Sequence, residues 1–283
     1  MTWAVVGSSG MFGSDMLKVL ETYGTQAKGF NRANLELTDP IESLARELSG
    51  SEFVVNAVAY TKVDLAEVNQ GPAQFANAEV PRKLAEACKL NGSRLIHIST
   101  DYVFYGESKN PYLPSSRTNP KSVYGITKLE GEDAVLDFEN TQVVRTAWLY
   151  GANGPCFPKT IASRLLAGKE SSVVDDQFGS PTHTLDLAHF VLALGGYPIL
   201  ERVLHGVSSG STSWFEFAQE IAANLGVSGD LVQPTSTTNY PTPAKRPANS
   251  VLEPSEGKGH QIPSWQQAWH SAADLVLEDI KLV

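Results

Sequence analysis

The segment Gly7-Ser8-Ser9-Gly10-Met11-Phe12-Gly13 follows the apolar run Trp3–Val6 directly and opens a helical pattern around Ser14–Tyr23. Glycines let a chain turn tightly and let backbone N–H groups approach a pyrophosphate closely. The helix N-terminus adds its positive dipole end at the same place. A three-glycine turn is a weak signal alone, but its position at the first strand–helix junction predicts a dinucleotide-binding unit.

Further short apolar runs alternate with helical patterns through the first half of the chain. We expect strands at Gln26–Phe30, Phe53–Val58, Leu95–Ile98 and Gln142–Thr146, with helices near Pro72–Lys89. Continuous apolar strands separated by helices are typical of a parallel sheet covered on both faces. Residues 1–150 are therefore predicted to form an α/β domain, a Rossmann-type doubly wound parallel sheet that binds a dinucleotide.

The second half, residues 151–283, has shorter elements and many Pro and Gly residues. We expect helices at Phe157–Leu166, Thr184–Ala193, Ser213–Leu225 and Ser264–Leu277, and loops at Asn239–Pro243 and Glu253–Gly259. We interpret this half as a smaller C-terminal substrate-binding lobe. It is predicted to be partly interleaved with the sheet domain, with segments near 182–207 and 235–252 returning to the sheet.

Composition narrows the class of protein. The 283 residues carry a formal charge of −9 and are 42% hydrophobic and 19% charged, as in soluble globular proteins. The negative charge argues against nucleic acid or an anionic membrane as a partner. Only two cysteines occur, Cys88 and Cys156, which disfavours disulfides and zinc and favours a reducing cytoplasm. We expect no signal peptide and no membrane span.

The end of the second strand bears on the choice of cofactor. NAD enzymes usually place an acidic residue there to bind the ribose 2′-OH, whereas an arginine suits the 2′-phosphate of NADP. This chain has Phe30-Asn31-Arg32 at that point. Arg32 therefore favours NADPH, while Glu36 nearby keeps NADH open. The alternative is that Arg32 is an ordinary surface arginine.

Two segments carry the candidate chemistry. Ser99-Thr100-Asp101-Tyr102-Val103-Phe104 ends a strand, at the edge of a parallel sheet where ligands bind. Tyr124 and Lys128 lie four residues apart and share a helix face. A free phenol has a pKa of about 10, and a nearby ammonium lowers it. We predict that Tyr124 donates a proton, Lys128 activates it, and Thr100 binds a carbonyl oxygen that becomes an alkoxide.

Longer motifs point to one family. They are Val55–Asp64, Ser99–Phe104, Val123–Leu129, Arg145–Tyr150, Asp176–Thr182 and Tyr240–Pro247. Through these motifs the chain resembles the dTDP-4-dehydrorhamnose reductases, a family of extended short-chain dehydrogenase/reductases, nearly from end to end. The resemblance implies an oxidoreductase of dTDP-rhamnose biosynthesis. Its members pass a hydride from the nicotinamide to C4 of a 4-keto sugar nucleotide, and Tyr124 would supply the proton.

The glycine turn, Arg32 and the resemblance together imply a set of ligand contacts. The cofactor would contact Gly7, Gly10, Met11, Phe12, Gly13, Asn31, Arg32, Glu36, Leu37, Ala59, Tyr60, Thr61, Tyr124 and Lys128. The substrate would contact Thr100, Asp101, Val103, Trp148 and Arg246. The role of Arg246 in holding a nucleotide diphosphate is inferred from its charge and loop setting, with a surface arginine as the alternative. For Trp148 the alternative is a core aromatic.

Several positions depart from the family pattern. The family often has Asn-Phe where this chain has Cys156-Phe157 flanked by prolines, which leaves the identity of the sugar open. It often has Asp where this chain has Asn31. Some members dimerise through Mg²⁺ bound by glutamates, one of them near the C-terminus. The tail Glu278–Val283 assigns no such site, and both monomer and homodimer stay open.

Three alternative functions share parts of this pattern. A related dTDP-4-keto-deoxysugar reductase fits the same motifs. A non-catalytic NADP-binding regulatory subunit, such as that of methionine adenosyltransferase, shares the fold, but the presence of Thr100, Tyr124 and Lys128 disfavours it. A dehydratase usually carries an Asp-Glu pair after the strand-end threonine, whereas here Asp101 is followed by Tyr102.

Overall fold

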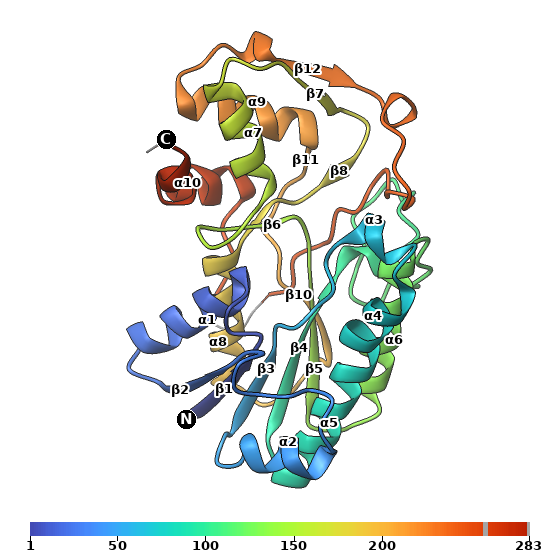
Figure 1. Ribbon diagram of the computed structural model, residues 1–283, viewed down its shortest axis with the longest axis vertical. Coiled ribbons are helices and arrows are strands. Elements are labelled where there is room, and N and C mark those ends of the chain that lie inside the picture. Colours follow the sequence, from blue (N-terminus) through green and yellow to red (C-terminus); the bar gives the residue numbers. More distant parts are fainter. Residues whose placement is uncertain (257–259, 282–283) are drawn as a thin grey trace.

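The computed structural model describes residues 1–256 and 260–281. Its central sheet has six parallel strands in the order β2-β1-β3-β4-β5-β10, which confirms the predicted doubly wound parallel sheet. The strands are β1 (Thr2–Val6), β2 (Gln26–Phe30), β3 (Phe53–Asn56), β4 (Arg94–Thr100), β5 (Thr141–Thr146) and β10 (Val203–His205). Figure 1 shows this sheet in the lower half of the molecule.

Helices cover both faces of the sheet. One face packs against α1 (Met11–Thr22) and α8 (Thr184–Gly195), and the other against α2 (Ile41–Glu47), α5 (Val80–Asn91) and α6 (Val123–Leu136). Side chains alternate between the faces along each strand. In β1, Trp3 and Val5 enter the α1/α8 core, while Ala4 and Val6 enter the α2/α5 core. Burial on both sides therefore explains why β1 is apolar from Trp3 to Val6.

The helix expected near Pro72–Lys89 is divided into three. It consists of α4 (Gln70–Gln74), the π-helical turn η1 (Phe75–Glu79) and α5, and the short α3 (Val63–Ala66) precedes it. Pro81 in the first turn of α5 has no N–H to give to the carbonyl of Asn77, so the regular α-helical pattern cannot run through this point. The carbonyl of Asn77 instead lies against Gly131 of α6, where a Cβ would strike it.

The upper lobe in Figure 1 is built on α7 (Phe157–Leu166), α9 (Trp214–Leu225) and α10 (Trp265–Lys281). These three helices share a core around Trp269, Phe217 and Ile221. Three two-stranded sheets complete the lobe and its junction with the main sheet: β7 (Ser171–Val174) with β12 (Val232–Thr235), β8 (Phe178–Gly179) with β11 (Thr212–Ser213), and β6 (Leu149–Tyr150) with β9 (Thr182–His183). Short 3-10 turns lie at η2 (Asp101–Val103), η3 (Gly229–Leu231) and η4 (Thr237–Asn239).

The chain crosses between the two parts more than once. After β9 it forms α8, which packs on the main sheet, and β10, which pairs with β5 at the sheet edge. Later, Asn249 and Leu252 form bridges to Glu107 and Tyr112 of the loop that follows β4. Loops from late in the sequence are thereby held at the edge of the sheet where β4 ends.

Both cysteines are buried and free. Within residues 1–256 and 260–281, no helix is long and apolar enough to cross a bilayer. Residues 257–259 of the expected loop Glu253–Gly259, and residues 282–283 of the tail Glu278–Val283, lie outside the described residues.

Candidate active site

In the turn after β1, the backbone leaves room only for glycine at positions 7 and 13. Gly7 has φ +91°, and a Cβ there would lie 2.9 Å from the carbonyl carbon of Ala57. A Cβ on Gly13 would strike the carbonyl oxygen of Gly7. The N–H groups of Gly7 and Ser8 both donate to the carbonyl of Phe30, at 2.8 and 3.0 Å. These backbone contacts and a hydrogen bond from the Ser14 hydroxyl to the carbonyl of Ser8, at 3.2 Å, hold the turn, and no side chain caps the N-terminus of α1 at Gly10.

This turn lies where the strand order reverses. The chain runs from β1 to β2 on one side and then returns to β3 on the other, and open α/β sheets bind ligands in the crevice at such a point. The loop after β3 is fixed at the same edge by Asn77. Its Oδ1 accepts from the N–H of Tyr60 at 2.8 Å, and its Nδ2 donates to Thr127 Oγ1 at 3.1 Å. The structure thus places Ala59, Tyr60 and Thr61 at the same edge as the glycine turn.

After β2, Asn31 and Glu36 form local hydrogen bonds, whereas Arg32 is exposed to solvent. Asn31 accepts from the N–H of Ala33 at 2.8 Å in a local turn. Glu36 accepts from the N–H and the hydroxyl of Thr38, at 3.1 and 2.7 Å, and these bonds lower the pKa of Glu36. Arg32 is exposed, and within the described part of the chain it forms no ion pair. The carboxylate of Glu36 is thus used locally, whereas the Arg32 guanidinium is not.

Thr100 and Tyr124 come together at the carboxyl end of β4. The hydroxyl of Thr100 donates to Asp101 Oδ1 at 2.9 Å, and a hydrogen bond between Thr100 and Tyr124 acts to lower the pKa of the phenol. Burial outweighs that bond and raises the pKa of Tyr124 above its usual range, with a further rise from the charge of Asp101. Burial also raises the pKa of Asp101, to about 6. At neutral pH Tyr124 is therefore the protonated phenol that a proton donor needs to be.

Lys128 lies beneath this pair and faces β4. Its Nζ donates to the carbonyl of Ile98 at 2.6 Å and lies 3.4 Å from His97 Nε2. Burial lowers the pKa of Lys128 to about 8, against an opposing effect of Glu132. The prediction that Lys128 lowers the pKa of Tyr124 is wrong for this structure, because that pKa is raised and Lys128 is not among its causes. A four-residue spacing puts two side chains on one helix face, but it does not decide where the lysine amine points.

A buried ion pair anchors the same helix one turn further on. Arg145 of β5 donates to both carboxylate oxygens of Glu132, with Nη2 to Oε2 at 2.7 Å, and Ser99 of β4 donates to Oε1 at 2.5 Å. Both charged side chains are at most 5% exposed. The sequence did not predict this pair, although a charged residue inside the buried strand Thr141–Thr146 was a visible signal.

Trp148 lies between the sheet and the upper lobe. Among the described residues it is the one non-glycine with positive φ, at +45°. Its ring stacks on Trp214 of α9, with centroids 3.4 Å apart and 4° between the planes, and Trp214 in turn contacts Phe157 at 4.5 Å. A Cβ on Gly179 would strike the Trp148 ring, so this packing requires glycine there. Trp148 is therefore a half-buried aromatic surface, and Trp214 is a site residue that the sequence did not single out.

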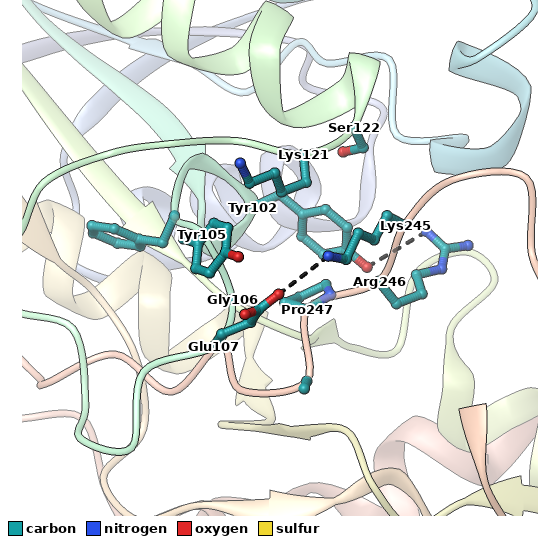
Figure 2. A pocket seen from close by; sticks show the side chains of 11 residues that line it. Tyr102, Tyr105, Gly106, Glu107, Lys121, Ser122, Lys245, Arg246 and Pro247 are labelled. Carbon is teal, nitrogen blue, oxygen red and sulfur yellow. Dashed lines mark hydrogen bonds and ion pairs between the residues drawn. The ribbon is translucent and has the colours of Figure 1, made fainter. Parts of the chain in front are cut away.

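Arg246 lies on the loop that crosses the edge of the site, as Figure 2 shows. Its Nη2 pairs with Asp64 Oδ2 at 2.6 Å, and its Nη1 lies 3.5 Å from the hydroxyl of Tyr102. The Tyr102 ring packs edge-on against Tyr124, with centroids 5.4 Å apart. A small cavity beside Arg246 is lined by Tyr102, Tyr105, Glu107, Lys121, Ser122 and Lys245. Arg246 thus lies beside Tyr102, and its charge is paired with Asp64, an ion pair that the sequence did not predict.

Two predicted contacts fall inside the core. Val103 is fully buried with Phe104 and Tyr112, so its side chain does not line the site as predicted. Phe12 is also buried, in the α1/α8 core, which leaves only its backbone to face a ligand. Within the part of the chain that the structure describes, no cluster of three or more His, Cys, Asp or Glu side chains is arranged to hold a metal ion.

Comparison with known proteins agrees with this geometry. Residues 1–279 match the family described as RmlD substrate binding domain. A dTDP-4-dehydrorhamnose reductase of Streptomyces griseus is 40% identical, covering 90% of this chain and 86% of its own. A probable dTDP-4,6-dihydroxy-2-methyloxan-3-one 4-ketoreductase of Streptomyces antibioticus is 38% identical, covering 99% of this chain and 96% of its own.

A solved structure extends the likeness to three dimensions. The crystal structure of a dTDP-4-dehydrorhamnose reductase of Bacillus anthracis, in complex with NADP, superposes with a TM-score of 0.90 at 32% identity. The superposition covers 96% of this chain and 98% of the other. Because the family match spans almost every residue and the fold agrees, this chain belongs to the RmlD substrate binding domain family.

Proposed function

We propose that this protein is an NADPH-dependent oxidoreductase that reduces the C4 keto group of dTDP-4-dehydro-L-rhamnose to give dTDP-L-rhamnose. The observation that carries the proposal is the placement of Thr100, Tyr124 and Lys128 beside a glycine-only turn at one sheet edge. The family match and relatives of that name at 40% identity support it. As a metabolic enzyme that uses NADPH and a sugar nucleotide, it is proposed to act in the cytoplasm.

The residues at the glycine turn fit a dinucleotide. A Cβ at position 7 or 13 would strike the backbone of Ala57 or of Gly7, so glycine allows the tight turn, and the N-terminus of α1, which no side chain caps, offers N–H groups to a pyrophosphate. We propose that this turn, Tyr60 and Arg32 hold the cofactor, and that residues 1–150 form the cofactor domain and 151–283 the substrate lobe. The nicotinamide, when bound, supplies the hydride.

The protein side of the reaction is a transfer of one proton. Thr100 and Tyr124 offer two hydroxyl groups to the carbonyl oxygen of the substrate, and Tyr124 gives its proton to the alkoxide as that charge develops. Trp148, half-buried and stacked on Trp214, is proposed to contact the sugar. Asp64 pairs with Arg246 and so keeps the crossing loop over the site.

A direct assay tests the assignment. Purified protein is expected to oxidise NADPH when dTDP-4-dehydro-L-rhamnose, made in place by the preceding epimerase, is supplied, and not when it is omitted. The product is identified as dTDP-L-rhamnose by chromatography against a standard. NADPH binding without turnover of this substrate would reject the rhamnose assignment while leaving the fold and the cofactor site intact.

A second candidate has its own support. The relative from Streptomyces antibioticus named as a probable 4-ketoreductase of another dTDP-linked sugar aligns over 99% of this chain. In addition, Cys156-Phe157 departs from the family pattern on the loop that leads to α7, whose Phe157 contacts Trp214. The same assay with a dTDP-linked 4-keto-2,6-dideoxy sugar separates the two, because the larger kcat/KM identifies the natural ketone.

Cofactor preference is expected to depend on Arg32. In the Arg32→Ala variant the KM for NADPH should rise by about tenfold or more, while the KM for NADH stays within about twofold, because a lost charge-assisted bond to the 2′-phosphate is worth roughly 1.5–3 kcal/mol. Steady-state kinetics with both cofactors measure this. Arg46→Ala, a change on α2 outside the site, is the matched control. Equal effects on both cofactors would assign the choice to another residue.

A further inference from the structure

Three buried residues, one on each of β3, β4 and α6, form a chain of hydrogen bonds that ends at Lys128. Asn56 Nδ2 lies 3.0 Å from His97 Nδ1, and His97 Nε2 lies 3.4 Å from Lys128 Nζ. Asn56 and His97 are fully buried, and Lys128 is 1% exposed. The rest of the site described above does not use Asn56 or His97. The arrangement of these three residues fixes which group donates and which accepts in each hydrogen bond between them.

Asn56 determines which groups donate and which accept in these hydrogen bonds. Its Oδ1 accepts from the backbone N–H of Val58 at 3.0 Å, so its amide NH₂ must face His97. His97 Nδ1 is therefore an acceptor and carries no hydrogen. A neutral imidazole has one N–H, which must then be on Nε2. Burial holds the pKa of His97 well below its usual range, so the ring is neutral.

The N–H of His97 consequently points at the nitrogen of Lys128. An ammonium has three donors and no acceptor, whereas a neutral amine has a lone pair that can accept this hydrogen. Lys128 still donates to the carbonyl of Ile98 at 2.6 Å in either state. We propose that His97 is a positioning residue that donates Nε2–H to Lys128 and thereby favours the neutral amine at the catalytic site.

Burial already lowers the pKa of Lys128, and the other charged and titratable groups around the amine do not add to this preference. On its own helix, Glu132 favours the ammonium, and that carboxylate is already neutralised by Arg145 of β5. Tyr124 precedes Lys128 by one turn and is held as the neutral phenol, and Asp101 of η2 acts on that phenol. His97 is the group on β4 that faces the amine directly.

The consequence concerns the proton that Tyr124 loses. After Tyr124 has protonated the alkoxide, its phenolate must regain a proton before the next turnover. A lysine whose two protonation states lie close in free energy near neutral pH releases and regains a proton readily, whereas an ordinary lysine stays protonated. This role in turnover rests on the proposed function, but the protonation of Lys128 is measurable without any turnover.

Three substitutions test the direction of the hydrogen bonds that link Asn56, His97 and Lys128. Two of them should reverse this direction and one should keep it. Asn56→Asp replaces the donor with an acceptor, which would move the His97 hydrogen to Nδ1 and leave Nε2 to accept from an ammonium. Asn56→Leu removes the donor without adding a charge and frees the ring to do the same. His97→Gln retains the polarity, because its amide can accept from Asn56 and donate to Lys128.

The readout is the titration of Lys128 in protein labelled with ¹³C at lysine Cε, with the resonance assigned from Lys128→Met. Asn56→Asp and Asn56→Leu are expected to raise the titration midpoint by about one pH unit or more, since new stabilisation of the charged form shifts a pKa by roughly this amount. His97→Gln is expected to keep the wild-type midpoint.

The pH profile of kcat checks the same shift in turnover. In both Asn56 variants, the apparent pKa of the limb that follows Lys128 should rise by the same amount as the titration midpoint. Unchanged midpoints in folded Asn56→Leu and Asn56→Asp, with or without a loss of rate, would overturn the proposal and leave His97 a structural residue. A shifted midpoint in a protein that fails to reduce the sugar nucleotide would instead count against the proposed function alone.

Discussion

Replacing Tyr124 with phenylalanine is expected to lower kcat by at least about a hundredfold, the usual contribution of a positioned general acid. The phenol is the group that Thr100 contacts by a hydrogen bond at the sheet edge, and its raised pKa keeps it protonated through the neutral range. Phenylalanine keeps the ring that packs edge-on against Tyr102 and removes only the proton donor. Steady-state oxidation of NADPH with the 4-keto sugar nucleotide measures the loss.

The comparison needs two controls. NADPH affinity, followed by fluorescence titration, should change little in Tyr124→Phe, so that the loss appears in kcat rather than in cofactor binding. Tyr23→Phe makes the same chemical change at an exposed tyrosine at the end of α1, outside the site, and should leave kcat unaltered. A wild-type rate in Tyr124→Phe would remove this residue from the mechanism and make another group the proton donor.

The largest expected effect on stability lies beneath the site. Glu132→Ala should reduce the free energy of unfolding by about 3–5 kcal/mol, the cost of leaving one partner of a buried ion pair uncompensated. Arg145 is 5% exposed and would retain its charge without the carboxylate, and Ser99 would lose its acceptor. Urea unfolding followed by circular dichroism measures the change, provided that the slope with denaturant stays constant.

A surface pair supplies the matched control. Glu86 pairs with Arg82 four residues earlier on α5, where both side chains are partly exposed. Glu86→Ala should therefore cost no more than about 0.5 kcal/mol, as for exposed helix pairs. In the double variant Glu132→Ala with Arg145→Leu, part of the lost stability should return, because no isolated charge remains. Equal destabilisation by Glu132→Ala and Glu86→Ala would show that burial does not control the strength of this pair.

Much of the fold could be predicted because it is encoded in local patterns. Burial on both faces favours continuous apolar residues, so the run at Trp3–Val6 and the Val143-Val144 centre of Gln142–Thr146 were readable without knowledge of their neighbours. The helix Phe157–Leu166 was predicted with its observed bounds. The turn Gly7–Gly13 was equally readable, since its glycines are required by the backbone approach to Ala57 and within the turn itself.

Other elements depended on distant partners. The two-residue strands β6 and β9 have no periodicity of their own and exist because each pairs with the other across the chain. The π-helical turn η1 arises from the conflict between Pro81 and a continuous helix, and its consequence, the position of Asn77, follows only from packing on α6. Propensity and pattern do not report such contacts, because they are made between residues far apart in sequence.

The same division holds in the active site. By itself, the sequence determined which residues are proposed to carry the chemistry, because a phenol, an amine and a hydroxyl at Tyr124, Lys128 and Thr100 are recognisable from their spacing and place in the βαβ pattern. Only the tertiary structure decided their electrostatics. Burial raises the pKa of Tyr124 and lowers that of Lys128, and the amine faces Ile98 and His97 on β4. Desolvation and hydrogen-bond direction depend on what surrounds a group in space, and a one-dimensional spacing contains neither.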